Sequence, residues 1–137
     1  MWDYHVITCH RGGDGGALVV YDFDSTLPFP CAARQYVDAT FKPQQRLKSQ
    51  YQRLFRVVRG KEAADSYSCD RSHMRNADGT WKAPPPPYKC YERDSSNNLS
   101  RFIDMSDTGF MGRLMDLEGF VSWLDPLEAA PPGSPPL

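Results

Sequence analysis

The 137-residue sequence has little net charge, no long apolar run and no closely spaced pair of cysteines. Its formal net charge of -1 gives no reason to expect nucleic acid as a partner. No apolar stretch approaches the ~20 residues that a membrane-spanning helix needs. Met1 is followed by Trp-Asp-Tyr-His and not by a basic and then an apolar segment. We therefore expect neither a membrane partner nor a secretory signal.

The four cysteines lie far apart and form no C-x-x-C pair: Cys9, Cys31, Cys69 and Cys90. In a chain of this size without a secretory signal, we interpret them as reduced thiols of the cytoplasm or nucleus. Together with the three histidines they match no compact pattern of zinc ligands. We therefore predict no metal site and no cofactor.

A hairpin is the clearest element of the sequence. Residues 2–11 and 17–24 are rich in β-branched and aromatic residues, and the sequence GGDGG lies between them. This pattern is typical of two antiparallel strands joined by a tight turn. Both strands carry apolar residues on both faces, so we expect the hairpin to be buried in a larger domain.

Periodicity and chain breakers predict the other elements. In chain order these are a helix at 32–41, a helix at 43–55 that starts at Pro43, a strand at 55–60, loop from 69 to 90, and a strand followed by a closing helix at 116–124. We predict one domain over residues 1–127. Residues 128–137 have the proline-rich composition of a disordered tail.

Two surface features suggest binding partners. Seven basic residues lie between positions 42 and 61, and we interpret them as a solvated helix face and not as a nucleic-acid surface. The sequence PPPY at 85–88 resembles a ligand of WW domains, but Trp81, Tyr88 and Tyr91 around it favour packing against the domain.

Candidate catalytic residues lie on the hairpin, where an aspartate is expected beside His5. A two-residue loop Gly13-Asp14 would place His5 opposite Asp22, because directly opposed side chains share a face of an antiparallel pair. A loop Asp14-Gly15 suits a type I′ turn and would instead place His5 opposite Asp24. A carboxylate beside an imidazole orients the ring and stabilises the imidazolium that forms in proton transfer.

Four ordered sequence blocks resemble the protein N-terminal glutamine amidohydrolase family: WDYHV at 2–6, YDFDSTLPFPC at 21–31, DRSHM at 70–74 and PPPPYKC at 84–90. The resemblance implies an α+β fold of the papain or transglutaminase type, in which an antiparallel sheet packs with helices. It implies a Cys-His-Asp triad that converts an N-terminal glutamine side chain to glutamate and releases ammonia.

The same resemblance implies residue roles, partners and location. His5 would be the general base and acid, and Asp22 its orienting carboxylate, which agrees with the first loop register. The partners would be proteins or peptides with an N-terminal glutamine, which the family prepares for the N-degron pathway. We expect a monomer of the cytoplasm and nucleus.

The family's nucleophilic cysteine precedes the WDYHV strand, whereas only four residues precede His5 here. Cys31 and Cys90 match other positions of the family blocks, and Cys69 has no motif context. Cys9 lies four residues from His5, or roughly 13 Å along a strand at ~3.3 Å per residue. We therefore expect an N-terminally truncated chain that is itself inactive. Apolar surface left uncovered by the absent segment would favour low solubility or partial unfolding.

Two other functions stay open. Asp22, Asp24 and Thr26 fit the D-x-D-x-T motif of Mg²⁺-dependent phosphatases, although that fold needs parallel strands and GGDGG indicates an antiparallel hairpin. A catalytically inactive remnant could instead act as a binding module, either for N-terminal glutamine or through the proline-rich segment.

Overall fold

The computed structural model describes residues 4–12, 16–43, 47–93 and 97–129. The chain divides into two compact units. The first unit comprises Met1–Phe55 and Met115–Leu137, and the second unit comprises Arg56–Leu114. The mixture of helices and small sheets confirms the predicted α+β class.

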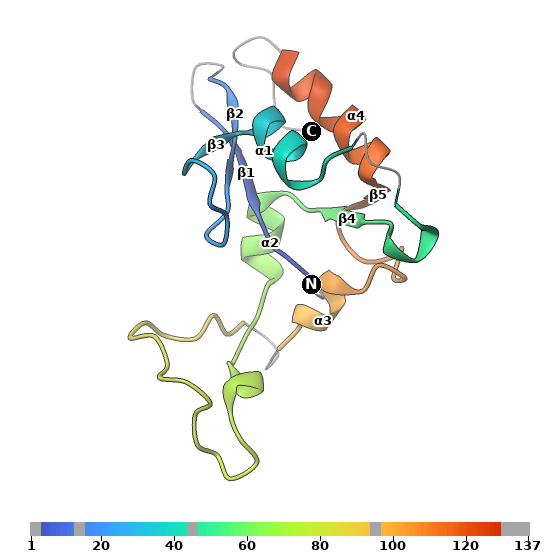
Figure 1. Ribbon diagram of the computed structural model, residues 1–137. Helices are drawn as coiled ribbons and strands as arrows, with labels where there is room; N and C mark the ends of the chain where they lie inside the picture. The colour runs from blue at the N-terminus through green and yellow to red at the C-terminus, as the bar shows by residue number, and fades with distance from the viewer. Residues whose placement is uncertain (1–3, 13–15, 44–46, 94–96, 130–137) are drawn as a thin grey trace. The chain divides into compact units, whose positions relative to one another are not determined.

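The first unit contains a three-stranded antiparallel sheet with the order β1-β2-β3. Its strands are β1 (Thr8–Arg11), β2 (Leu18–Tyr21) and β3 (Cys31–Ala32), and β3 leads directly into helix α1 (Ala33–Thr40). Figure 1 shows α1 beside this sheet. The predicted hairpin and the predicted helix at 32–41 are therefore both present, with shorter strands than expected.

The core of the first unit lies between β2 and α1. Leu18 and Val20 alternate with half-buried residues, so the inward face of β2 is apolar. Helix α1 presents Ala33, Tyr36 and Val37 at helical spacing, and all three are at most 1% exposed. Packing of these two apolar faces against each other removes them from solvent, and this burial stabilises the unit.

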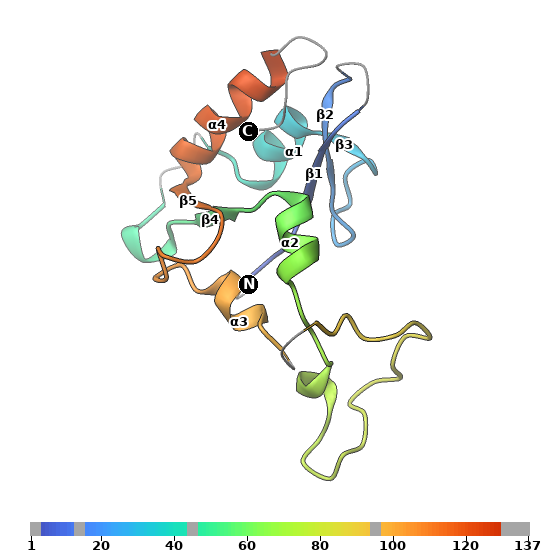
Figure 2. The same cartoon turned by 180° about the vertical axis from the view of Figure 1, so that it is seen from behind.

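An aromatic cluster joins this core to helix α4 (Leu117–Ala129). Phe41 lies 5.7 Å from Tyr36 and 5.1 Å from Phe55 between ring centroids. Phe55 stacks on Phe120 of α4 at 4.5 Å. An ion pair between Arg34 of α1 and Asp125 of α4 also links the two helices. The two helices lie side by side in both views (Figures 1 and 2).

The predicted helix at 43–55 is wrong. The structure has a 3₁₀ turn, η2 (Ser49–Tyr51), followed by strand β4 (Leu54–Val57), while residues 44–46 lie outside the described residues. In the strand Leu54 is 54% exposed and Phe55 packs into the aromatic cluster. The alternation of a strand thus overrides the apolar spacing that suggested a helix.

Strand β4 pairs with β5 (Arg113–Asp116) in a two-stranded sheet, and β5 continues into α4. The predicted strand followed by a closing helix is therefore confirmed in this part of the chain. Helix α4 runs to Ala129, and residues 130–137 of the predicted tail lie outside the described residues. The prediction of a disordered tail thus stays a prediction.

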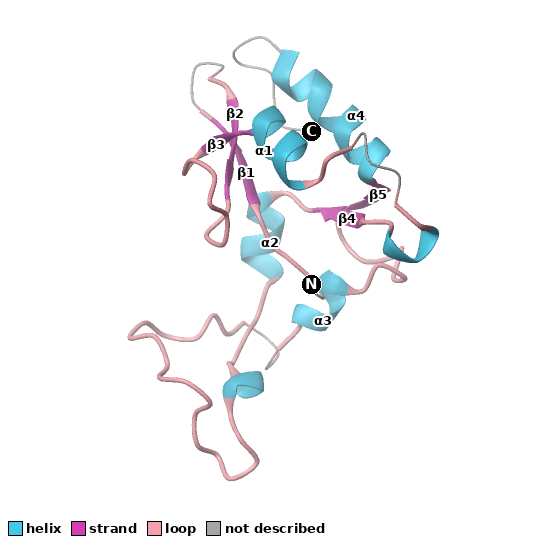
Figure 3. Cartoon of the chain, viewed as in Figure 1, coloured by secondary structure: helices cyan, strands magenta, loops and turns pink. Residues whose placement is uncertain are grey.

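The second unit has fewer buried apolar side chains and more loop. Its helices are α2 (Gly60–Ser66), the 3₁₀ turn η3 (Ser72–Met74) and α3 (Leu99–Ile103), and Figure 3 shows the long loop between α2 and α3. The guanidinium of Arg56 donates hydrogen bonds to the backbone carbonyls of Met111, Asp104 and Asp107 at 2.6–3.0 Å. Such bonds fix the loop where apolar burial is small. No helix among the described residues is long and apolar enough to cross a membrane.

Gly112 and Gly79 provide a matched test of packing in the second unit, because both have positive φ, at +84° and +85°. A Cβ at Gly112 would lie 2.6 Å from the carbonyl oxygen of Val57, whereas a Cβ at Gly79 meets nothing within 4 Å. We predict that Gly79→Ala costs about 1 kcal/mol of unfolding free energy, the cost of backbone strain alone. Gly112→Ala should cost about 2 kcal/mol more, because the carbonyl must move. Urea unfolding of both variants measures the difference, and equal costs would contradict it.

Candidate active site

Asp22 directly follows strand β2 and continues its inward face. Leu18 and Val20 point into the core, and the two-residue period of a strand places Asp22 on the same side. Its side chain is accordingly only 7% exposed. A buried carboxylate is costly unless polar partners surround it, so its contacts are decisive for this region.

Three donors surround the Asp22 carboxylate. The Tyr36 hydroxyl donates to Oδ2 at 2.6 Å, and the backbone amide of Asp24 donates to Oδ1 at 2.9 Å. His5 Nε2 lies 3.0 Å from the same Oδ1. Each oxygen therefore has at least one partner, which offsets the loss of water on burial.

These contacts decide the charge state of Asp22. Burial alone would raise its pKa, but the hydrogen bonds from Tyr36, from the Asp24 amide and from His5 outweigh burial and hold the pKa below its ordinary value. Burial and the adjacent carboxylate conversely raise the pKa of Tyr36. At neutral pH the pair is therefore a carboxylate accepting from a protonated hydroxyl.

His5 lies in an extended segment before β1, and its side chain is 25% exposed. A carboxylate only accepts hydrogen bonds, so a neutral imidazole must carry its proton on Nε2 to bond with Asp22. The contact between His5 and Asp22 that the sequence suggested is therefore present, and it fixes one tautomer of the ring.

The hairpin register that would have explained this contact is wrong. Thr8 pairs with Tyr21 and Cys9 with Val20, which corresponds to the Asp14-Gly15 loop and not to the Gly13-Asp14 loop. The turn itself lies outside the described residues. His5 precedes the first paired residue of β1, so the ladder does not set its side chain opposite Asp24, and Nε2 contacts Asp22 Oδ1 at 3.0 Å.

Tyr36 is the member of the site that sequence reasoning missed. It lies on the buried face of α1 between Ala33 and Val37. A signal was present in the sequence, because a tyrosine on the apolar face of a helix must bury its hydroxyl and needs an acceptor there. The acceptor comes from Asp22, fourteen residues away in sequence.

Nitrogen and carboxylate donors of His5, Asp22 and Asp24 lie within 4.8 Å of one another, so these residues are the described set best placed to hold a metal ion. Both oxygens of Asp22 already accept hydrogen bonds from protein donors. A metal bound through His5 Nε2 would have to displace the hydrogen bond between His5 and Asp22. We therefore describe the site as a hydrogen-bonded pair of His5 and Asp22.

Comparison with known proteins adds to this geometry. Residues 1–124 match the family model of N-terminal glutamine amidase. The chain belongs to this family. It is 41% identical over 121 residues to the protein N-terminal glutamine amidohydrolase of Homo sapiens, covering 88% of this chain and 58% of that relative. The Arabidopsis thaliana protein of the same name is 39% identical over 117 residues, covering 83% of this chain and 53% of the relative.

The chain thus spans little more than half the length of these amidase relatives. Within the described residues, the amidase family explains the site better than the phosphatase motif does. Asp22, Asp24 and Thr26 follow β2, and β2 pairs antiparallel with both β1 and β3. The parallel strands that the phosphatase fold needs are therefore not present on either side of β2.

Removing the Tyr36 hydroxyl tests the network around Asp22. In Tyr36→Phe the buried Oδ2 loses its donor, so we predict that the Asp22 pKa rises toward its ordinary value. The unfolding free energy should fall by about 1–3 kcal/mol, the usual cost of an unsatisfied buried polar group. Carbon-13 NMR titration of the Asp22 carboxyl measures the pKa. Tyr51→Phe, at a 50% exposed tyrosine, is the control, and an unchanged Asp22 pKa in Tyr36→Phe would refute the network.

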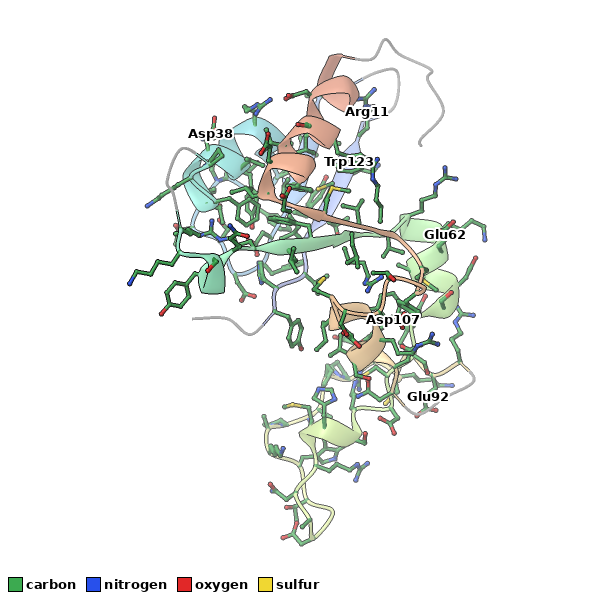
Figure 4. All side chains as sticks on the ribbon, turned by 90° about the vertical axis from the view of Figure 1, so that its right-hand side faces the viewer. Arg11, Asp38, Glu62, Glu92, Asp107 and Trp123 are labelled. Atoms are coloured by element: carbon green, nitrogen blue, oxygen red, sulfur yellow. The ribbon has the colours of Figure 1, made fainter. Side chains whose placement is uncertain are left out.

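Acid unfolding tests the charge state independently. Because the folded pKa of Asp22 lies below its ordinary value of 3.8, ionised Asp22 contributes stability above about pH 4, and this contribution is lost as the pH falls through the folded pKa. We predict that the stability difference between wild type and Asp22→Asn shrinks below about pH 4. Urea unfolding from pH 7 to pH 3 measures it. Asp38→Asn, on the exposed face of α1 (Figure 4), is the control variant, and a pH-independent difference for Asp22→Asn would contradict the prediction.

Proposed function

We propose that this protein takes part in the hydrolysis of the side-chain amide of an N-terminal glutamine, giving glutamate and ammonia. The observation that carries the proposal is the 3.0 Å contact between His5 Nε2 and Asp22 Oδ1 in a chain of the N-terminal glutamine amidase family. The substrates would be proteins and peptides that begin with glutamine, and the product would enter the N-degron pathway. The protein would act as a monomer in the cytoplasm and nucleus.

In this proposal His5 moves the protons. Since Nε2 donates to Asp22, Nδ1 is the nitrogen that exchanges a proton with the nucleophile. It accepts the proton of a thiol, and the thiolate attacks the carboxamide carbon to form a tetrahedral intermediate. The imidazolium then protonates the departing nitrogen. Ammonia is released, and a thioester between the thiol and the substrate remains. Water that loses its proton to His5 hydrolyses the thioester and restores the thiol.

Asp22 orients the ring and stabilises the imidazolium. Its low pKa keeps it negatively charged while His5 is protonated. Burial strengthens this interaction, because the carboxylate is 7% exposed and little water screens it. Tyr36 and the Asp24 amide hold the two carboxylate oxygens in place.

None of the four cysteines of this sequence fits the role of the nucleophile in the proposal. Burial raises the pKa of the Cys9 thiol to about 11, so Cys9 stays protonated at neutral pH. Cys31 is 2% exposed and Cys69 is 8% exposed, which leaves little access for a substrate. The thiol of the fourth cysteine, Cys90, donates a hydrogen bond to the carbonyl oxygen of Asp70 at 3.5 Å. We therefore propose that this chain is inactive by itself and that the thiol belongs to a part of the relatives that the chain does not cover.

A binding module is the second candidate function, and exposed apolar side chains support it. Tyr4 and Val6, on either side of His5, are 46% and 68% exposed. Phe23, next to Asp22, is 90% exposed and lies 5.0 Å from the ring of the 53% exposed Phe29. These four exposed apolar side chains lie close in sequence to His5 and Asp22. A group of exposed apolar side chains is typical of a surface that another chain covers.

Ammonia release from a glutamine-initiated peptide tests the proposed reaction. We predict no turnover with the present chain. A chimera that joins this chain to the part of the human relative outside the match should release ammonia, because it regains the thiol. In the chimera His5→Ala should lower the rate about a thousandfold or more and Asp22→Asn about a hundredfold or more.

Asp38→Asn is the matched control, since this carboxylate is exposed on α1 whereas Asp22 is buried. An asparagine-initiated peptide controls for specificity. Turnover by the present chain at the rate of the human relative would refute the assignment of the nucleophile. If the chimera is inactive while the present chain binds glutamine-initiated peptides more tightly than glutamate-initiated ones, the binding module is correct instead.

A further inference from the structure

The proline-rich segment of the second unit is exposed along its length. Pro84, Pro85, Pro86 and Pro87 are all exposed, and Tyr88 is 70% exposed. The interpretation that Trp81, Tyr88 and Tyr91 favour packing of this segment against the domain is therefore wrong for the prolines and for Tyr88. The ring borders an open hollow of about 240 Å³, lined also by Tyr67, Cys69, Arg71, Lys89 and Tyr91, so one side of Tyr88 faces space and not a core.

The backbone of this segment is conformationally restricted in the unbound protein. It lies outside every helix and strand (Figure 3). Each proline ring fixes φ near −65°, and a residue that precedes proline is excluded from the helical region. Residues 84–86 each precede a proline. Their sequence therefore favours an extended or polyproline II backbone, which binds partners at a small cost in conformational entropy.

Arg71 fixes the carboxyl end of the segment. Its guanidinium donates hydrogen bonds to the carbonyl oxygens of Tyr88 at 3.0 Å and Lys89 at 3.3 Å. The same guanidinium lies 4.9 Å from the centre of the Tyr88 ring, so it contacts one face of the ring. Arg71 thus holds the prolines and the tyrosine together as one ordered surface feature.

We propose that residues 85–88, with the sequence Pro-Pro-Pro-Tyr, form a docking site for a WW-type domain. Such a domain takes two prolines of a polyproline II helix in an aromatic groove and a tyrosine in a neighbouring pocket. The chemistry required of the ligand is present here as adjacent exposed prolines followed by an exposed tyrosine. Burial of the Tyr88 ring by the partner supplies apolar contact area that the segment now leaves in water.

The sequence Pro84 to Lys89 also fits the P-x-x-P-x-K pattern of ligands for SH3-type domains. In that mode Tyr88 would be an intervening residue whose ring the partner does not need to bury. The 70% exposure of the ring favours the mode that uses it. The proposal concerns the second unit alone and does not depend on the proposed deamidation.

Isothermal titration of the full chain with an isolated WW domain that binds Pro-Pro-x-Tyr peptides tests the proposal. We expect one-to-one binding that Tyr88→Ala weakens about tenfold or more, since a buried aromatic anchor dominates such contacts. Tyr51→Ala, at a 50% exposed tyrosine outside the segment, should bind within about twofold of wild type, because a residue outside the contact surface leaves affinity unchanged. Circular dichroism shows whether each variant remains folded, and Pro85→Ala replaces Tyr88→Ala if the latter unfolds.

A synthetic peptide of residues 82–91 shows whether the sequence itself is recognised. Binding by both the peptide and the full chain supports the proposal. Binding by the peptide but not by the full chain would overturn it, because the segment would then not be accessible in the folded protein. Equal affinity of wild type and Tyr88→Ala would also overturn it, as would binding to an SH3 domain that Lys89→Ala abolishes while the WW domain does not bind.

Discussion

Burial of the Asp22 carboxylate is the constraint on which the arrangement of the first unit depends. Strand alternation after Leu18 and Val20 directs Asp22 into the core, where a charge is costly without partners. The unit meets this cost with a hydroxyl from α1, an amide from the following turn and the imidazole of His5. Two segments that are distant from Asp22 in sequence, the His5 segment and helix α1, are thereby held to one side chain. The same contacts that satisfy the carboxylate also orient the imidazole, so stability and the proposed chemistry share one network.

Different kinds of contact stabilise the two units. The first unit packs an apolar strand face against an apolar helix face and adds aromatic contacts that extend from Tyr36 through Phe41 and Phe55 to Phe120. The second unit buries little and relies on arginine side chains that donate to backbone carbonyls, as Arg56 and Arg71 do. Loops fixed in this way stay at the surface with their side chains exposed. This difference explains why the proposed chemistry lies in the first unit and the proposed docking segment in the second.

Local patterns were sufficient to predict the hairpin, helix α1, the closing helix and the pairing of His5 with an aspartate. They failed where two periodicities competed: the apolar residues between Leu47 and Phe55 fit a helix, but packing of Phe55 on Phe120 selected a strand. They left two hairpin registers open, and the structure has the one that does not place His5 opposite Asp22, since the contact between His5 and Asp22 depends on a segment outside the ladder. Tyr36 was missed because its acceptor is distant in sequence. Tertiary packing, which no local window contains, decided each of these cases.

The tautomer of His5 is the most direct test of the central claim, which is that Asp22 accepts a hydrogen bond from Nε2. Nitrogen-15 NMR of the ring in the folded chain, at a pH where the imidazole is neutral, distinguishes the two ring nitrogens. We expect Nε2 to carry the proton, and we expect Asp22→Asn to alter the chemical shift of this nitrogen more than that of Nδ1. A neutral ring with its proton on Nδ1 and an unprotonated Nε2 would contradict the account, because a carboxylate cannot donate to the nitrogen beside it.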